Sequence, residues 1–236
     1  MSNISTDHVW GQNYDGIEIK SDERVHSEIA KILQRLFPDR TSAISVLDIA
    51  SGHGALTKRV QDLYPNWSFQ INDLEHTNPI SQVTTSTINL NSKFGSSLSQ
   101  FDVVLCAEVI EHLENPWNLL RELRTIVKPG AIVILSTPNS DSLLDRIEYL
   151  KHGHAFYFGE RGFINSGGHI TPVPDWLFRK IAAVSGFEVS ELNSVSTKPF
   201  IRKYMLPAQL LLTLYLKILR REFNNRSINI YILKCL

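Results

Sequence analysis

Three polar residues that could act together chemically lie in one short stretch of the chain: Glu108, Glu111 and His112. They stand at positions i, i+3 and i+4, so their side chains would share one face if the chain turns helical here. His169, which precedes a later helical pattern, offers a second imidazole. Two carboxylates and two imidazoles form a donor set that suits a divalent cation.

A cation held by these four residues would chelate two adjacent substrate oxygens and make a hydroxyl proton easier to remove. Magnesium or manganese suits the carboxylates, and zinc, iron or cobalt suits the imidazoles. Without a metal, His112 or His169 would act as a general base, with Glu111 beside it. A third interpretation gives these residues a structural role. The sequence leaves the three interpretations open.

A glycine turn indicates a second functional group of residues. The apolar run Ala43 to Ala50 ends in Ser51-Gly52-His53-Gly54, where a strand meets a helix and the backbone can approach a ligand closely. A dinucleotide-binding motif would have its third glycine at Thr57, which argues against a dehydrogenase. Asp48 and Asp73 end two successive strands, where they can orient the turn and accept hydrogen bonds from a ribose diol.

Other histidines and aromatic residues give weaker signals. His53 lies inside the glycine turn and is expected to shape it, and a polar loop explains His152 and His154 as well as ligation does. Three aromatic residues are expected either to cover an acceptor pocket or to pack in the core: Tyr157, Phe158 and Phe163.

These residues must be positioned by alternating strands and helices. The pattern predicts an entry helix over about Ser27 to Phe37 and a later helix over Asp175 to Ser185. Such alternation is typical of an α/β fold with a doubly wound, mostly parallel sheet. One apolar run predicts a strand that ends at Ile71. The other apolar runs predict strands at Ala43–Ala50, Ile88–Leu90, Val103–Cys106, Ile132–Leu135, Phe187–Leu192 and Ile228–Leu233.

We expect one domain over residues 1–236, with an N-terminal helical entry segment at 1–42 and a helical insertion at 193–227. Lys plus Arg and Asp plus Glu both number 24, so the formal charge is zero and nucleic acid is not an expected partner. The 2 cysteines lack metal-ligand spacing, and the first ten residues lack an apolar signal core. Both features predict a cytoplasmic protein.

A hydrophobic segment at 205–221 is not one of the strands or helices that the α/β pattern requires. It is too short and interrupted to span a bilayer. We expect a helix buried against the domain or a second subunit of a homodimer. The alternative is an interfacial helix at the inner membrane face, with headgroup contacts from five basic residues: Arg202, Lys203, Lys217, Arg220 and Arg221.

Five ordered motifs together resemble class I S-adenosylmethionine-dependent methyltransferases. Their similarity covers about residues 43 to 192 and implies a Rossmann-like, seven-stranded sheet with helices on both faces. Two departures are Ala50, where the family usually has its first glycine, and Asn72, which precedes Asp73 where one acid is usual. The motifs are Val46–Gly54, Phe101–Leu113, Leu119–Leu123, Val127–Gly130 and Leu135–Asn139.

The resemblance implies S-adenosylmethionine as the cofactor. Asn89 and Leu90 would lie beside its adenine, and Ala107 and Glu108 would border its methionine end. Asp73 is preferred over Asn72 for the ribose, because an ionised carboxylate is the stronger acceptor. The implied cofactor residues are Asp48, Ala50, Ser51, Gly52, Gly54, Asp73, Asn89, Leu90, Ala107 and Glu108.

The pattern Glu-x-x-Glu-His with a later histidine is similar to metal-assisted O-methyltransferases of the ubiquinone pathway and of small-RNA ribose ends. Both act on vicinal hydroxyls. The whole chain also resembles bacterial methyltransferases of surface-glycan synthesis, so we expect O-methylation of a sugar, glycan or other vicinal-diol acceptor. The alternatives are a quinone precursor or secondary metabolite, an RNA ribose, and, least favoured, a non-catalytic cofactor-binding subunit.

Overall fold

The computed structural model describes residues 12–74, 80–95, 98–165, 167–196, 207, 210, 211, 214, 215 and 226–236. Its centre is a seven-stranded sheet in the order β5-β4-β3-β6-β7-β9-β8. The pairs formed among β3 to β7 are parallel, whereas β9 runs antiparallel to both β7 and β8. The strands are β3 Ser45–Ile49, β4 Ser68–Asn72, β5 Val83–Ser86, β6 Phe101–Ala107, β7 Val127–Pro138, β8 Phe187–Val195 and β9 Ile228–Cys235.

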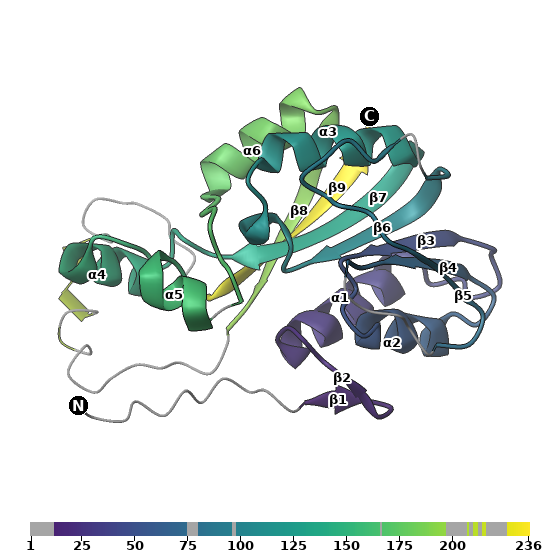
Figure 1. The fold of residues 1–236 in the computed structure, drawn as a ribbon, viewed down its shortest axis with the longest axis horizontal. Coiled ribbons are helices and arrows are strands. Elements are labelled where there is room, and N and C mark those ends of the chain that lie inside the picture. Colours follow the sequence, from purple (N-terminus) through teal and green to yellow (C-terminus); the bar gives the residue numbers. More distant parts are fainter. Residues whose placement is uncertain are drawn as a thin grey trace.

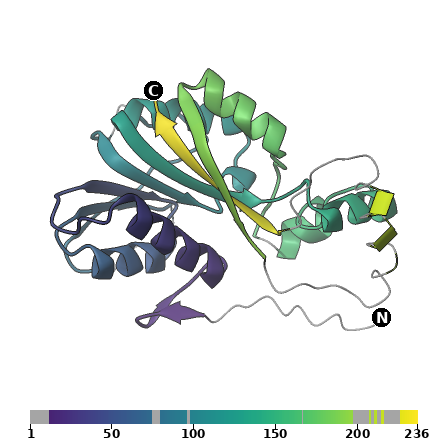
Figure 2. The same ribbon diagram turned by 180° about the vertical axis from the view of Figure 1, so that it is seen from behind.

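Helices cover both faces of this sheet (Figures 1 and 2). On one face lie α3 (Pro116–Ile126) and α6 (Asp175–Val184), and on the other lie α1 (Glu23–Leu36) and α2 (Ala55–Leu63). The strands are apolar on both sides because each face packs into its own core: Leu47 belongs to the first, and neighbouring Val46 to the second. The predicted doubly wound, mostly parallel seven-stranded sheet is therefore confirmed.

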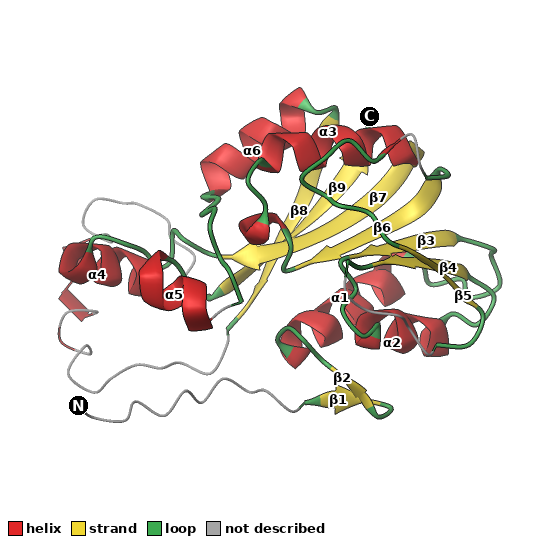
Figure 3. Ribbon diagram, in the orientation of Figure 1, coloured by secondary structure: helices red, strands yellow, loops and turns green. Residues whose placement is uncertain are grey.

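Two further helices lie beside the sheet rather than on a face. Figure 3 shows α4 (Leu143–His152) and α5 (Gly159–Asn165) grouped beyond the carboxyl end of β7. The 3-10 turn η2 (Ile110–His112) follows β6 and faces the same edge of the sheet. α4, α5 and η2 therefore lie at the carboxyl end of the sheet.

Several predicted elements differ from the structure. The entry segment holds more than a helix, because the short strands β1 (Asn13–Tyr14) and β2 (Ile17–Glu18) form a hairpin before α1. The third strand is Val83–Ser86, not the apolar run Ile88–Leu90. It is the edge strand and pairs only with β4, so its mostly exposed threonines and serine carry little apolar signal.

The predicted insertion at 193–227 is described only in part. Residues 193–195 belong to β8, and most of the hydrophobic segment 205–221 lies outside the described residues. Five residues of that segment are described as helical: Pro207, Leu210, Leu211, Leu214 and Tyr215. The last four have exposed side chains. Among the described residues, no helix has the length and apolar character needed to cross a bilayer.

Candidate active site at the carboxyl edge of the sheet

The candidate site lies where β3 and β6 are neighbours. From this point the chain winds outward in both directions, to β4 and β5 on one side and to β7 on the other. Loops that leave two such strands diverge to opposite faces of the sheet, which creates the crevice where α/β proteins bind ligands. The glycine turn follows β3, and the stretch that contains Glu108, Glu111 and His112 follows β6.

The glycine turn adopts backbone conformations that explain its residue types. Ala50, Gly52 and Gly54 have φ angles of 52°, 54° and 82°, which L side chains rarely adopt. Ala50 is exposed and pays a conformational cost of about 1 kcal/mol at the position where the family usually has glycine. A Cβ on Gly52 would lie 3.1 Å from Cγ of Lys20. The positive φ angles therefore favour glycine in this turn, and such a turn would let a cofactor approach the backbone closely.

Asp73 and Asn72 take different positions at the end of β4. The Gly52 N–H donates to Oδ2 of Asp73 at 2.8 Å, and the Asp73 side chain stays partly exposed. Asn72 is buried, and its amide donates to the Ile88 carbonyl at 3.3 Å. This geometry supports Asp73 as the acid that faces a ribose, and that role remains a prediction.

Asp48 was expected to orient the glycine turn and to bind a ribose, and its position suits only the first role. It is buried at 2% exposure, and Oγ1 of Thr57 donates to its Oδ2 at 2.6 Å. Burial, with a smaller contribution from the Asp73 charge, raises the pKa of Asp48 to about 7. Asp48 thus connects β3 to α2 and orients the turn, while its burial argues against contact with a ribose.

The remaining cofactor candidates border the same edge of the sheet. Ser51 donates its N–H to the Asn72 carbonyl at 3.0 Å, and Ala107 is partly exposed at the end of β6. Asn89 is exposed, and its Oδ1 accepts from the Asn91 N–H at 2.9 Å, whereas Leu90 is buried. Their predicted contacts with the adenine and the methionine end remain predictions.

Glu108 does not share a helical face with Glu111 and His112. The chain is not α-helical here: Glu108 has a φ of 56°, and only the 3-10 turn η2 follows. The Glu108 carboxylate instead accepts from Oγ of Ser136 at 2.7 Å, and burial raises its pKa to about 7. The positive φ turns this side chain toward β7, so the structure places Glu108 outside the group of candidate metal ligands.

Glu111, His112 and His169 do come together. One potential ligand atom from each lies within 4.8 Å of the others, and the two imidazole rings are 4.7 Å apart. The carbonyl of Glu111 accepts from the Ile170 and Thr171 N–H groups at 2.9 and 3.0 Å, which joins the loop that carries His169 to η2. The tertiary fold therefore builds a three-residue group from distant segments.

The Glu111 side chain has the clearest need of a ligand. It is fully buried, and neither carboxylate oxygen has a hydrogen-bond partner within the part of the chain that the structure describes. Burial and then the nearby Glu108 carboxylate raise its pKa well above the ordinary range, and its own backbone N–H and the Thr137 hydroxyl oppose that rise only weakly. A buried carboxylate with so little stabilisation is costly. A divalent cation bound by Glu111, His112 and His169 would remove that cost, so these residues fit a metal.

Aromatic side chains lie beside His169. The ring centroids of Tyr157 and Phe158 are 6.4 and 5.6 Å from that of His169, and Phe158 is buried. Phe163 is half-exposed on α5. We call residues 155–158, which connect α4 to α5, the lid turn. Its rings give the acceptor side an apolar, aromatic border.

The other histidines lie apart from this group. His152 stacks on His154 at a centroid distance of 6.0 Å and lies 3.5 Å from a Glu148 carboxylate oxygen. His53 lies 3.2 Å from a Glu18 carboxylate oxygen, so it connects the glycine turn to the hairpin. These contacts are consistent with structural roles.

The sequence interpretation missed the hairpin that packs beside the glycine turn. Besides the Glu18 contact, the Tyr14 hydroxyl donates to Asp62 of α2 at 3.1 Å, and the Arg59 guanidinium lies 4.4 Å from the centre of the Tyr14 ring. Asp15 and Gly16 both have positive φ angles at the hairpin turn. An Asp-Gly pair is a known hairpin signal, so this element was detectable.

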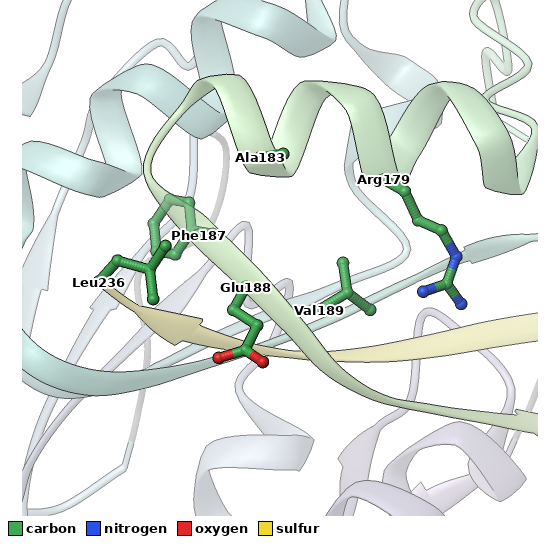
Figure 4. Close-up of a pocket in the computed structure, with 6 residues that line it drawn as sticks. All are labelled: Arg179, Ala183, Phe187, Glu188, Val189 and Leu236. Atoms are coloured by element: carbon green, nitrogen blue, oxygen red, sulfur yellow. The ribbon is translucent and has the colours of Figure 1, made fainter.

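A surface pocket elsewhere does not belong to the site. Figure 4 shows it between α6 and the start of β8. Phe187 pairs with Cys235, and β9 in turn is antiparallel to β7, so this pocket lies toward the amino ends of the parallel strands. The residues that line it are Arg179, Ala183, Phe187, Glu188, Val189 and Leu236.

Comparison with known proteins agrees with this geometry. The family model described as "Methyltransferase domain" matches residues 21–192. A ubiquinone biosynthesis O-methyltransferase from Thiobacillus denitrificans is 28% identical over 123 residues, which cover 52% of this chain and 51% of that protein. One from Pseudomonas putida is 26% identical, covering 52% of each chain. The chain therefore matches about half the length of these curated relatives.

Solved structures support the same fold. A S-adenosylmethionine-dependent methyltransferase from Archaeoglobus fulgidus has a TM-score of 0.57 and 15% identity, covering 89% of this chain and 94% of that one. The phosphoethanolamine N-methyltransferase 2 of Haemonchus contortus, solved with S-adenosyl-L-methionine, has a TM-score of 0.54 and 14% identity, covering 88% and 52%. The chain belongs to the methyltransferase domain family and is a class I S-adenosylmethionine-dependent methyltransferase.

Proposed function

We propose that this methyltransferase methylates one hydroxyl oxygen of an acceptor that carries two adjacent oxygens, and that a divalent cation on Glu111, His112 and His169 binds the pair. The observation that carries this proposal is the convergence of three potential ligand atoms around a buried Glu111 carboxylate with no hydrogen-bond partner among the described residues.

The protein side chains have distinct tasks in this proposal. Glu111 supplies the negative charge, and His112 and His169 supply neutral imidazole nitrogens. Burial lowers the pKa of His112, which keeps that ring neutral and able to accept a metal or a proton. S-adenosylmethionine, held at the glycine turn, supplies the electrophilic methyl group. The cation supplies Lewis acidity and a template for two oxygens.

The donor set points to a class of metal. Because Glu108 lies outside the group, the ligands are one carboxylate and two imidazoles rather than two of each. Imidazole-rich sites favour zinc, iron or cobalt over magnesium or manganese. In a five- or six-coordinate site, two imidazoles and one carboxylate leave coordination positions for both acceptor oxygens.

The acceptor we favour is an aromatic catechol, as in a quinone precursor. Tyr157 and Phe158 border His169, and aromatic faces stack on aromatic substrates. The names of the curated relatives support the same acceptor class. A sugar or glycan diol, which we expected from the sequence, becomes the second candidate. The zero formal charge gives less support to an RNA ribose.

Chelation tests the metal, and matched acceptors test the substrate. We expect a chelator to abolish methyl transfer to catechol, and a divalent transition metal to restore it. Phenol, which lacks the second oxygen, should be a much poorer acceptor, and a methyl glycoside with a cis-diol represents the sugar class. Transfer that resists chelation would contradict the metal and favour His112 or His169 as a metal-free base.

We also propose that the exposed apolar side chains of Leu210, Leu211, Leu214 and Tyr215 contact an anionic membrane surface. Leu210, Leu211, Leu214 and Tyr215 recur at helical spacing with exposed side chains, and the sequence places basic residues on both sides of them. We expect the protein to float with anionic vesicles and not with neutral ones. Concentration-dependent dimerisation without flotation would assign this surface to a second copy of the chain instead.

A further inference from the structure

We propose that Asp145 is a positioning residue of the acceptor site: its buried side chain holds the lid turn, so that Tyr157 and Phe158 lie against His169. Among the described residues, the hydrogen bonds of Asp145 go to Ser142 and Phe156 and not to the candidate metal ligands or the glycine turn. The inference rests on the proposed function, because the lid turn affects catalysis only if the acceptor binds beside His169.

Asp145 connects α4 to the lid turn through a single buried carboxyl group. It lies in the first turn of α4 and is 1% exposed. Its Oδ1 accepts from the Phe156 N–H at 2.7 Å, and its Oδ2 accepts from the Ser142 hydroxyl. Its own N–H donates to Oγ of Ser142 at 3.1 Å, the N-cap contact of the helix. One side chain therefore joins the start of α4 to backbone beyond its end.

Helix α5 holds the lid turn from its other end. Phe158 donates its N–H to the Ala155 carbonyl at 3.0 Å, which closes the turn. A Cβ on Gly162 would lie 2.4 Å from the Tyr157 carbonyl oxygen, so α5 packs directly against the turn. A Cβ on Gly159 would lie 2.7 Å from the His154 ring. The turn is fixed from both sides, and Asp145 supplies the polar contact.

The ionised form of Asp145 suits this task. Burial raises its pKa to about 6, while Ser142 and the Phe156 N–H oppose the rise by stabilising the charge. At neutral pH the carboxylate accepts both hydrogen bonds, and charge-assisted acceptors are the stronger ones. Without this acceptor the partly buried Phe156 N–H would lose its protein partner, which favours release of the turn.

Two variants of Asp145 test the role. Asp145→Asn keeps an acceptor oxygen for the Phe156 N–H, whereas Asp145→Leu fills similar space without one. With catechol as the probe acceptor, we expect Asp145→Leu to raise KM about tenfold at little cost in kcat, with unchanged S-adenosylmethionine affinity. Asp145→Asn should restore the wild-type KM. Amide hydrogen exchange of residues 156–158 should accelerate in the leucine variant only.

The control is Asp102→Leu. Asp102 lies at the amino end of β6, whereas the candidate site lies at the carboxyl end of the strands. Asp102 accepts from the Ser45 N–H at 2.9 Å and from Lys128 Nζ at 2.8 Å, so its loss removes comparable contacts far from the acceptor. We expect a lower Tm with an unchanged KM for catechol. If Asp145→Leu only lowers Tm to the same extent, or leaves KM and the exchange of 156–158 unaltered, the positioning role is wrong.

Failure of the proposed function would look different. In that case the wild-type protein itself would not methylate catechol, and hydrogen exchange would decide the lid inference alone. Faster exchange confined to residues 156–158 in Asp145→Leu, with wild-type exchange in Asp145→Asn, would support the role of Asp145 in holding the turn. Uniform exchange changes across the chain would overturn it.

Discussion

The two sides of the active site satisfy their polar groups differently. On the methyl-donor side, which is the glycine turn and the strand ends beside it, the Asp48 carboxylate accepts a hydrogen bond from Thr57, and Asp73 accepts one from the Gly52 N–H. We call this the donor side. On the acceptor side, the fully buried Glu111 has two oxygens with no hydrogen-bond partner in the described part of the chain. Protein groups thus satisfy the carboxylates beside the glycine turn, whereas a bound cation would satisfy Glu111.

The two sides also differ in how they are assembled. The donor turn follows β3 directly, and its contacts come mainly from the neighbouring strand end and the next helix. The acceptor group joins η2 to a loop near residue 169 through the backbone of Ile170 and Thr171, and the lid turn comes from a third segment. Variants that change one side of the site and leave the other intact test whether the two sides differ in these ways.

The largest effect is expected from Glu111→Gln. This change keeps the shape but removes the buried charge, so we expect at least about a 100-fold loss of methyl transfer, with cofactor affinity preserved. At neutral pH the metal-free variant should be more stable than the metal-free wild type, because folding disfavours the ionised form of Glu111 that the unfolded chain prefers, and glutamine carries no such penalty. Thermal unfolding with and without added metal measures both states. Equal stabilisation of wild type and variant by metal would contradict the assigned ligand.

The next effect is expected on the donor side, from Gly52→Val. The φ of 54° disfavours a β-branched residue, and the added side chain would enter the space beside Lys20 and the cofactor. Calorimetry should detect little or no S-adenosylmethionine binding. Gly130→Ala is the control, since that glycine has a φ of 76° with open space around its Cβ position. It should lose some stability but bind cofactor normally, and intact binding by Gly52→Val would contradict cofactor binding at this turn.

The smallest effect is expected from Ala50→Gly. Alanine at a φ of 52° carries a conformational cost that glycine avoids. The variant should gain up to about 1 kcal/mol in the free energy of unfolding, measured by urea titration. Cofactor affinity should change little, because the backbone path is kept. A loss of stability would show that the alanine methyl group contributes more through packing than it costs in strain.

Much of the donor side could be predicted from residue types because its elements are contiguous. A strand, a glycine turn and a helix follow one another from Ser45 to Leu63, and the acid after the next strand is Asp73. The burial of Asp48 and its bond to Thr57 were harder to foresee, since they depend on how α2 packs. The edge strand β5 was misplaced because its exposed residues carry little apolar pattern.

The acceptor side depended more on long-range contacts. Helical spacing suggested a common face for Glu108, Glu111 and His112, but the φ of 56° at Glu108 turns its side chain to Ser136 instead. Nothing in residue spacing indicates that conformation for a glutamate. The approach of His169 was expected from the family pattern, while its distance from Glu111, 4.0 Å between Nε2 and Oε1, is a property of the folded chain.

The local order of residues along this chain was sufficient for the α/β class, the parallel strands and the glycine turn, because hydrophobic periodicity and backbone freedom act over a few residues. The tertiary structure determined the partners of the buried carboxylates of Glu108, Asp145 and Glu111. It directs Glu108 to Ser136 and away from the candidate metal ligands, brings Asp145 to the lid turn, and buries Glu111 beside two imidazoles. Those outcomes depend on packing between distant segments, which no local pattern encodes.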